Sequence, residues 1–108
     1  MMPSGRLVTA LDVLTLLIEG VDKTTLETEL IASAWTAIAA RGGSKSGQGH
    51  IWSSPGSQCS VRIMSQIDGS CYARVYNGPG GGAPGEQPLN ASGQPGTRGE
   101  THFLLISN

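Results

Sequence analysis

The hydrophobic positions at the start of the chain recur at helical spacing and predict a first helix over residues 9–19. Leucines and an isoleucine return every three or four positions, which is typical of a helix with one buried face. Thr9 is placed to cap the first turn, and Asp12 near it interacts favourably with the helix dipole. Gly20 stands where a helix ends, because glycine readily adopts the left-handed conformation of a C-cap.

A second helix is predicted directly after it, over residues 24–40. Thr24 and Glu27 form a capping-box pattern, in which each side chain bonds the other residue's backbone amide. Apolar residues then continue at helical spacing as far as Ala40, and Gly42 and Gly43 follow as a stop signal. We expect the two helices either to form an antiparallel pair or to be one broken element.

After residue 41 the pattern changes to short apolar segments between turns, which is typical of strands. The last segment is nearly continuously apolar, so we expect it to be a central strand covered on both faces. Two N-terminal helices packed on a four-stranded antiparallel sheet, an α+β fold, are therefore predicted. The four predicted strands are residues 50–52, 61–64, 72–76 and 101–106.

One hairpin determines which side chains share a face of that sheet. If Asp68 and Gly69 are the two central residues of its turn, Arg62 faces Val75 across the strands. Arg62 and Arg74 then lie on opposite faces, and no disulfide crosses the hairpin. A turn with an odd number of residues would instead bring both arginines to the same face, because a slip of one residue inverts a strand.

The composition indicates one small domain without a membrane span. The 108 residues include 16 glycines and 6 prolines, and residues 78–99 alone hold eight of the former and four of the latter. We expect a helical part at 1–41 and a sheet part at 42–108, with 78–99 as a long loop. No apolar run approaches the roughly 20 residues that cross a bilayer, and the first residues do not resemble a signal peptide.

The charge is distributed unevenly along the chain. Residues 1–40 carry two basic and five acidic side chains, a net of −3, and residues 41–108 carry five basic and three acidic ones, a net of +2. Both histidines lie in the second part. A basic region favours phosphate-bearing partners, and the alternative is a scatter of solvated arginines.

The sequence contains no motif for phosphate binding by a P-loop, for a disulfide scaffold or for a zinc site. The glycine-rich run lacks the lysine and helix of a phosphate-binding P-loop, and Cys59 and Cys71 are too few for a disulfide scaffold or a zinc site. What remains, two histidines among five arginines, suits cleavage of RNA without a metal or other cofactor. That reaction needs a base for the 2′-hydroxyl proton, an acid for the leaving oxygen, and cations around the phosphorus. Histidine titrates in the required range, and arginine binds phosphate through paired donors.

The order of short motifs over residues 35–106 resembles the C-terminal toxin domains of bacterial polymorphic toxins, such as those ending RHS-repeat and filamentous-haemagglutinin proteins. This resemblance implies a ribonuclease of the barnase/EndoU/colicin/RelE-like group, with N-terminal helices against an antiparallel sheet. Leu104 stands where the family pattern has proline, and the loop after residue 78 is longer than in that pattern. The motifs are Trp35 and residues 49–57 (GHIWSSPGS), 60–64 (SVRIM), 72–77 (YARVYN) and 93–103 (GQPGTRGETHF).

The resemblance matches three residues to functional positions: His102 as general acid or base, and Arg62 and Arg74 as ligands of the scissile phosphate. Among the remaining residues, Thr101 is a candidate to orient His102 or to contact phosphate, and His50 is a second candidate for proton transfer. For each residue the alternative is a purely structural role in or beside a strand. Candidates to bind substrate outside the reacting group, by charge or by stacking on a base, are Lys45, Arg98, Tyr76 and Trp52.

The sequence and the resemblance together predict a metal-independent ribonuclease toxin. We expect a monomer with an RNA substrate and a cognate, acidic immunity protein, without a membrane partner. The producing cell would deliver or secrete it, and it would act in the cytoplasm of the target cell. The alternatives are a non-enzymatic protein-binding module, an inhibitor or adaptor that uses the sheet and the glycine-rich loop, and a toxin of another chemistry on nucleic acid.

Overall fold

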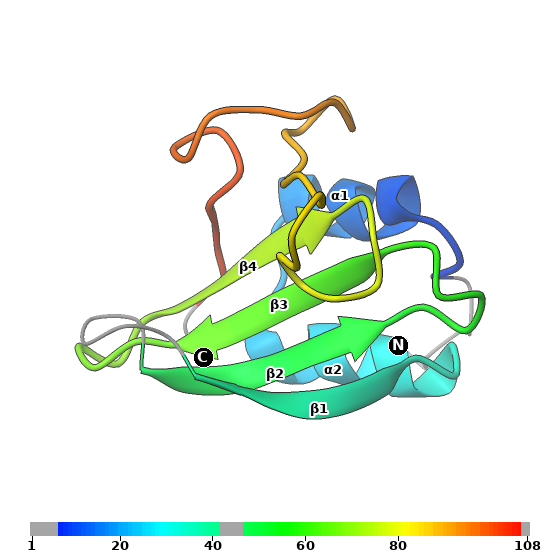
Figure 1. Cartoon of the computed structure of the whole chain (residues 1–108). Helices are drawn as coiled ribbons and strands as arrows, with labels where there is room; N and C mark the ends of the chain where they lie inside the picture. Colours follow the sequence, from blue (N-terminus) through cyan, green and yellow to red (C-terminus); the bar gives the residue numbers. More distant parts are fainter. Residues whose placement is uncertain (1–6, 42–46, 107–108) are drawn as a thin grey trace.

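The computed structural model describes residues 7–41 and 47–106, which form two N-terminal helices packed against an antiparallel sheet of five strands. Figure 1 labels both helices and the first four strands. The strands follow one another across the sheet in chain order. The predicted α+β class is confirmed, with one strand more than expected. The strands are β1 (Thr36–Arg41), β2 (Gln48–Ser53), β3 (Ser60–Ser65), β4 (Cys71–Tyr76) and β5 (Phe103–Leu104).

The first helix, α1 (Ala10–Glu19), forms as its sequence predicts. The Thr9 hydroxyl accepts a hydrogen bond from the Asp12 amide at 3.3 Å, and the Asp12 carboxylate accepts one from the Thr9 amide at 2.8 Å. These two bonds satisfy amides that have no partner inside the helix. The bond from the Thr9 backbone, with a second from Val8, lowers the pKa of Asp12. Gly20 ends the helix with φ at +98°.

The second helix, α2 (Lys23–Ala32), is shorter than predicted, and its cap is Asp22 rather than Thr24. The Asp22 carboxylate accepts the amide of Thr25 at 3.1 Å. The chain leaves the helix at Ala34, which has φ at +66°, and continues as β1. The prediction of helix as far as residue 40 is wrong, and residues 36–41 belong to the sheet part. Small apolar residues fit either periodicity, and pairing with β2 decides between them.

The predicted last strand is also different. Only Phe103 and Leu104 pair with β4, at the edge of the sheet, and the Leu104 side chain is 67% exposed. The expectation of a central, doubly covered strand is wrong, because the chain leaves the sheet after two residues. Leu105 is buried in the core, and the amide of Ile106 bonds the carbonyl of Val21 at 2.9 Å. The apolar run therefore joins the sheet to the helices.

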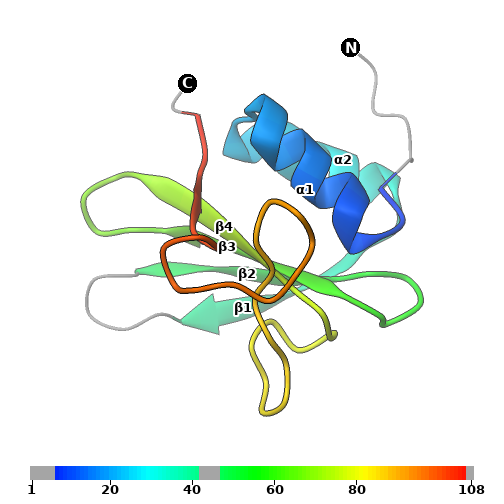
Figure 2. The same ribbon diagram turned by 90° about the horizontal axis from the view of Figure 1, so that it is seen from above.

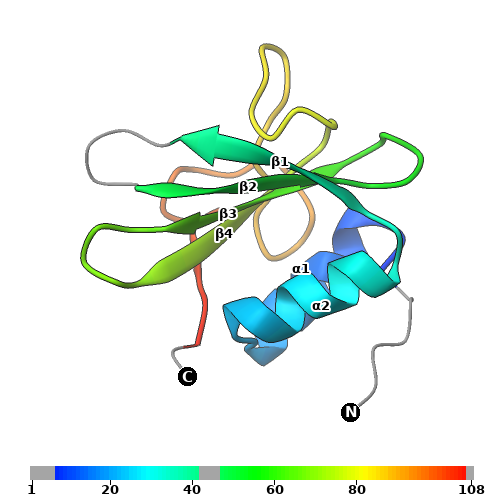
Figure 3. The same ribbon diagram turned by 90° about the horizontal axis from the view of Figure 1, so that it is seen from below.

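The two faces of the sheet have different surroundings. The helices cover one side, which we call the helix face, and the loop at 78–86 projects from the other side, which we call the open face (Figures 2 and 3). Trp35 closes the helix side near the start of β1, where its indole N–H donates to the carbonyl of Leu7 at 2.7 Å. The core side chains that are essentially inaccessible to solvent are Val13, Leu14, Leu26, Leu30, Val61, Ile63, Ala73 and Val75.

Candidate functional site

The register of the β3–β4 hairpin brings Arg62 and Arg74 opposite each other, so both lie on the open face. Of the two turn lengths that the sequence leaves open, the structure has the odd-length one. Gln66–Ser70 form the connection, closed by a bond from the Gln66 amide to the Ser70 carbonyl at 2.8 Å. The Asp68 carboxylate accepts the Ser70 amide at 2.9 Å and thereby stabilises the longer turn.

Neutral groups hold the Arg74 side chain on the open face. Its Nε donates to the Thr101 hydroxyl at 3.4 Å, and its Nη2 donates to the carbonyl of Arg98 at 3.3 Å. Its guanidinium carbon lies 5.4 Å from the centre of the Tyr72 ring. In the described ranges no carboxylate forms an ion pair with Arg74. Its charge is therefore available to an anionic ligand.

His102 lies against the same aromatic ring. The imidazole and the Tyr72 ring stack with centroids 4.2 Å apart and planes 24° apart. Partial burial lowers the pKa of His102, and the positive charges of Arg74 and Arg98 lower it further. An imidazole with a depressed pKa is neutral at neutral pH, which is the form that accepts a proton.

Thr101 acts on Arg74 rather than on His102. Its side chain is completely buried, and its hydroxyl donates to the Arg98 carbonyl at 3.2 Å while accepting from Arg74. One hydroxyl thus ties the segment before β5 to the arginine of β4. Two roles were open for Thr101, to orient His102 or to contact phosphate. Within the described structure no hydrogen bond joins Thr101 to His102, so the first role is not supported.

Arg74 and Thr101 line a shallow cleft of about 450 Å³. Three segments that are distant in sequence form its walls: the second half of β4, the glycine-rich loop, and the turn before β5. Its lining residues are Arg74, Tyr76, Gly82, Glu86, Pro88, Arg98 and Thr101. Of the predicted site residues, four line this cleft, and His102 is adjacent to it through Tyr72 and Arg74.

Glu86 is a cleft residue that is not among the predicted site residues. Its carboxylate accepts backbone amides from Gly80 at 2.7 Å, Gly82 at 2.9 Å and Ala83 at 3.2 Å. Burial raises the pKa of Glu86, but the bonds from Gly82, Gly80 and Ala83 together lower it below its usual value. Glu86 is therefore ionised at neutral pH and closes the loop. A sequence signal for this contact is present: a run of glycines, whose backbone amides can converge on an anion, is followed by a single acidic residue.

Arg62 supports the loop and does not line the cleft. Its Nη1 donates to the Gly81 carbonyl at 3.2 Å. Beside it, the Ser60 hydroxyl donates to the Gly78 carbonyl at 2.6 Å and accepts the Gly81 amide at 2.8 Å. The two arginines that the sequence assigns to phosphate thus have different surroundings, and Arg74 is the one at the cleft.

Of the other predicted site residues, His50 and Trp52 lie away from the cleft. His50 pairs with Ile63 in the register of β2 and β3, which places it on the helix face, away from His102. Trp52 is 8% exposed and belongs to the core, so the structure contradicts its expected role in stacking on a base. Lys45 lies outside the described residues.

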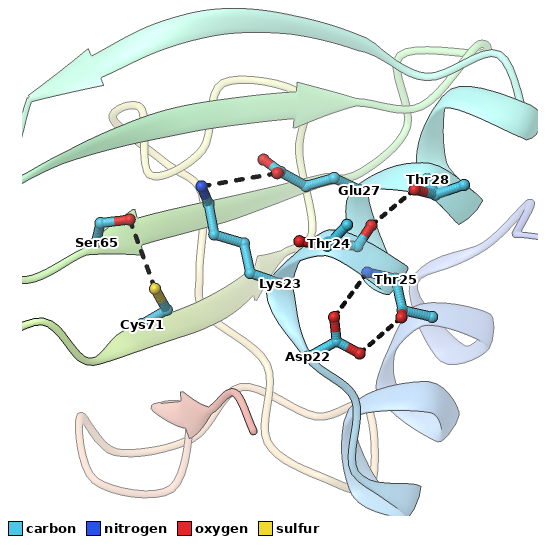
Figure 4. A network of polar contacts seen from close by, with 8 residues as sticks. All are labelled: Asp22, Lys23, Thr24, Thr25, Glu27, Thr28, Ser65 and Cys71. Carbon is cyan, nitrogen blue, oxygen red and sulfur yellow. Dashed lines mark hydrogen bonds and ion pairs between the residues drawn. The ribbon is translucent and has the colours of Figure 1, made fainter. Parts of the chain in front are cut away.

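A second hollow, of about 460 Å³, lies beside His50 at the far end of β1 and β2, and Lys23 contributes its charge. Figure 4 shows the polar contacts nearby, where the Lys23 ammonium lies 3.8 Å from the Glu27 carboxylate and the Ser65 hydroxyl 3.5 Å from the Cys71 sulfur. Lys23 already has an acidic partner here, whereas Arg74 has none within residues 7–41 and 47–106. We therefore take the open-face cleft as the candidate site.

Within the described ranges, no group of three His, Cys, Asp or Glu side chains is arranged to hold a metal ion. Neither α1 nor α2 is long and apolar enough to cross a membrane. The chain matches no protein-family model, no curated protein and no solved structure at a significant level. The likeness to toxin domains is therefore a resemblance of motifs alone, and the function of the cleft follows only from the residues that line or adjoin it.

Proposed function

We propose that the chain is a metal-independent ribonuclease whose open-face cleft binds the scissile phosphodiester. The observation that carries this proposal is the shared position of His102 and Arg74 on the Tyr72 ring, beside the cleft. A proton acceptor and a cation that has no acidic partner among the described residues lie against one aromatic ring. A phosphodiester needs both groups close together.

In the proposed reaction, neutral His102 takes the proton of the ribose 2′-hydroxyl. The 2′-oxygen forms a bond to phosphorus, the bond from phosphorus to the 5′-oxygen breaks, and the leaving oxygen takes up a proton from water. The products are a 2′,3′-cyclic phosphate and a 5′-hydroxyl. Arg74 and Arg98 stabilise the charge that develops on the non-bridging oxygens.

The depressed pKa of His102 supports its role as the base. A protonated imidazole cannot accept the 2′-hydroxyl proton. Partial burial lowers the pKa of His102, the positive charges of Arg74 and Arg98 lower it further, and together they favour the neutral, active form. The same charges attract the phosphate. One pair of arginines thus serves both binding and proton transfer.

The proposal includes a biological role as a toxin that is delivered to the cytoplasm of a target cell. An acidic immunity protein would cover the cleft in the producing cell. The motif order over residues 35–106 and the arginines at the cleft support this part of the proposal. Expression of the chain alone should then arrest growth, and coexpression of the acidic immunity protein should relieve this arrest.

The first experiment is incubation with total bacterial RNA in EDTA, followed by a denaturing gel. His50→Ala is the matched control for His102→Ala, because the two histidines lie on opposite faces of the sheet. We expect discrete cleavage by the wild type and by His50→Ala, with cyclic phosphate ends, and intact RNA with His102→Ala. Equal cleavage by both variants would exclude His102 as the base.

One observation favours the alternative of a protein-binding module. β1 is an edge strand whose first five residues, 36–40, are uncharged, and Ile38 on it is 64% exposed. Such an edge can accept a strand from a partner. Intact RNA in all lanes, together with a complex that Ile38→Lys disrupts, would support this alternative.

A further inference from the structure

The cleft contains an aromatic ring that the proposed reaction does not use. Arg74 and Tyr76 are two positions apart on β4, so their side chains point to the same face, about 7 Å apart along the strand. Tyr76 is half-buried and lines the cleft. Tyr72, by contrast, is 5% exposed and lies against His102 and Arg74. Of these two tyrosines, Tyr76 is the one that a ligand can reach.

The backbone around Tyr76 holds this ring at the cleft. Pro88 forms a β-bridge with Tyr76, and Gly82 approaches the tip of the ring. A Cβ on Gly82 would lie 3.3 Å from the Tyr76 Cζ, and Gly82 has φ at +107°, so glycine suits this position on both counts. The loop that Glu86 closes thus packs on Tyr76 through backbone rather than through a bulky side chain. This leaves room in the cleft beside Tyr76.

We infer that the cleft is a subsite for one unpaired nucleobase, which stacks on Tyr76 while its phosphate binds Arg74 and Arg98. This inference rests on the proposed function, since it takes a polynucleotide as the ligand, and it names single-stranded RNA as the substrate class. A site of about 450 Å³ is in the range that holds a small ligand such as a nucleotide. Aromatic rings stack on any base, so the subsite alone imposes little sequence preference.

The requirement for an unpaired base follows from the geometry of duplex RNA. In a duplex, both faces of a base are stacked on neighbouring pairs, and the major groove is too deep and narrow for side chains to enter. A ring that lines a shallow cleft beside the phosphate site can stack only on a base that has left such a helix. Single strands and loops provide these bases.

The test measures binding separately from cleavage. The probe is a fluorescein-labelled 2′-O-methyl RNA dodecamer of mixed sequence, which has no 2′-hydroxyl to react, alone or annealed to its complement. Fluorescence anisotropy at one fixed salt concentration gives its affinity for the wild type, Tyr76→Leu and Tyr76→Phe. Leucine keeps apolar bulk without an aromatic face, whereas phenylalanine keeps the face and removes only the hydroxyl.

We expect the single strand to bind about tenfold more tightly than the duplex. Tyr76→Leu should lose about tenfold in affinity for the single strand and change little for the duplex, whereas Tyr76→Phe should stay within about twofold of the wild type. Equal affinity for single strand and duplex would overturn the inference. So would a Tyr76→Leu variant that melts like the wild type and binds the single strand equally well. If Tyr76→Leu does not fold, the comparison of single strand with duplex on the wild type decides.

The two proposals fail in different ways. If the dodecamer binds as expected but total RNA stays intact, the subsite stands and the ribonuclease proposal fails. If RNA is cleaved but Tyr76→Leu leaves single-strand affinity unchanged, the ribonuclease stands and the stacking subsite fails.

Discussion

The two faces of the sheet differ in where the same strands carry charge, because the arginines of β3 and β4 lie on the open face alone. On β3, Val61 and Ile63 point to the helices and are fully buried, whereas Arg62 between them lies under the loop of the open face. On β4, Ala73 and Val75 alternate in the same way with Arg74. The alternation of a strand thus places the larger core on the helix face and both arginines on the open face, where a smaller buried cluster of Ala40, Ile51, Met64 and Tyr72 lies beside them. Substitutions on the two faces should therefore affect different measurements.

The largest expected effect is on the open face, where Arg74 and Arg62 lie directly opposite each other. Arg74→Lys should lower kcat/KM for RNA cleavage by about 100-fold, because lysine cannot reproduce the planar, multiple donors of a guanidinium at the phosphate. Arg62→Lys should lower it far less, since its Nη1 is directed at the Gly81 carbonyl. Initial rates on a fluorogenic RNA oligonucleotide measure both. Equal losses would show that the two arginines share the phosphate, as the sequence suggests.

The helix face should give the complementary result. Ile63→Ala removes a fully buried side chain from the core, and we expect unfolding to become easier by about 3 kcal/mol. Urea denaturation followed by circular dichroism measures this change. At a temperature where the variant is folded, its kcat/KM should match the wild type within about threefold. A large loss of activity in fully folded Ile63→Ala would contradict the separation of the two faces.

The sequence predicts the face of the sheet on which a residue lies only where it also predicts the pairing register of the strands. The sequence predicts α1, the central strands and the α+β class, because those segments have one clear period. It misassigns residues 36–41 because alanine-rich segments fit a helix or a strand equally well. It also leaves open the faces of Arg62 and Arg74, since the length of the turn depends on the bond from Ser70 to Asp68.

The site depended on contacts that the sequence pattern does not encode. Glu86 meets the amides of Gly80, Gly82 and Ala83 only after the loop has folded on the open face. Thr101 reaches Arg74 across 27 positions of the chain. His102 was identified through the resemblance in motif order, and its place beside Arg74 came from the structure.

A smaller effect is expected at Thr101, where a buried hydroxyl joins two segments. Thr101→Val keeps the shape of the side chain but leaves the Arg98 carbonyl and the Arg74 Nε without this partner. We expect a loss of about 1–2 kcal/mol in the free energy of unfolding and a fall of about tenfold in kcat/KM. Thr101→Ser, which retains the hydroxyl, should restore most of both. Loss of stability without loss of activity would limit Thr101 to a structural role.

The smallest expected effect is a shift in the pH dependence of RNA cleavage, caused by a change in the pKa of His102. Partial burial lowers the pKa of His102 and the positive charges of Arg74 and Arg98 lower it further, so removing one of these charges should raise the pKa. In Arg98→Gln, the His102 resonances in an NMR titration should move to a higher midpoint by a fraction of a pH unit. Because only neutral His102 accepts a proton, the acid limb of log(kcat/KM) against pH should move to higher pH by the same amount. A moved NMR midpoint with an unmoved acid limb would show that His102 titrates beside the cleft without serving as its base.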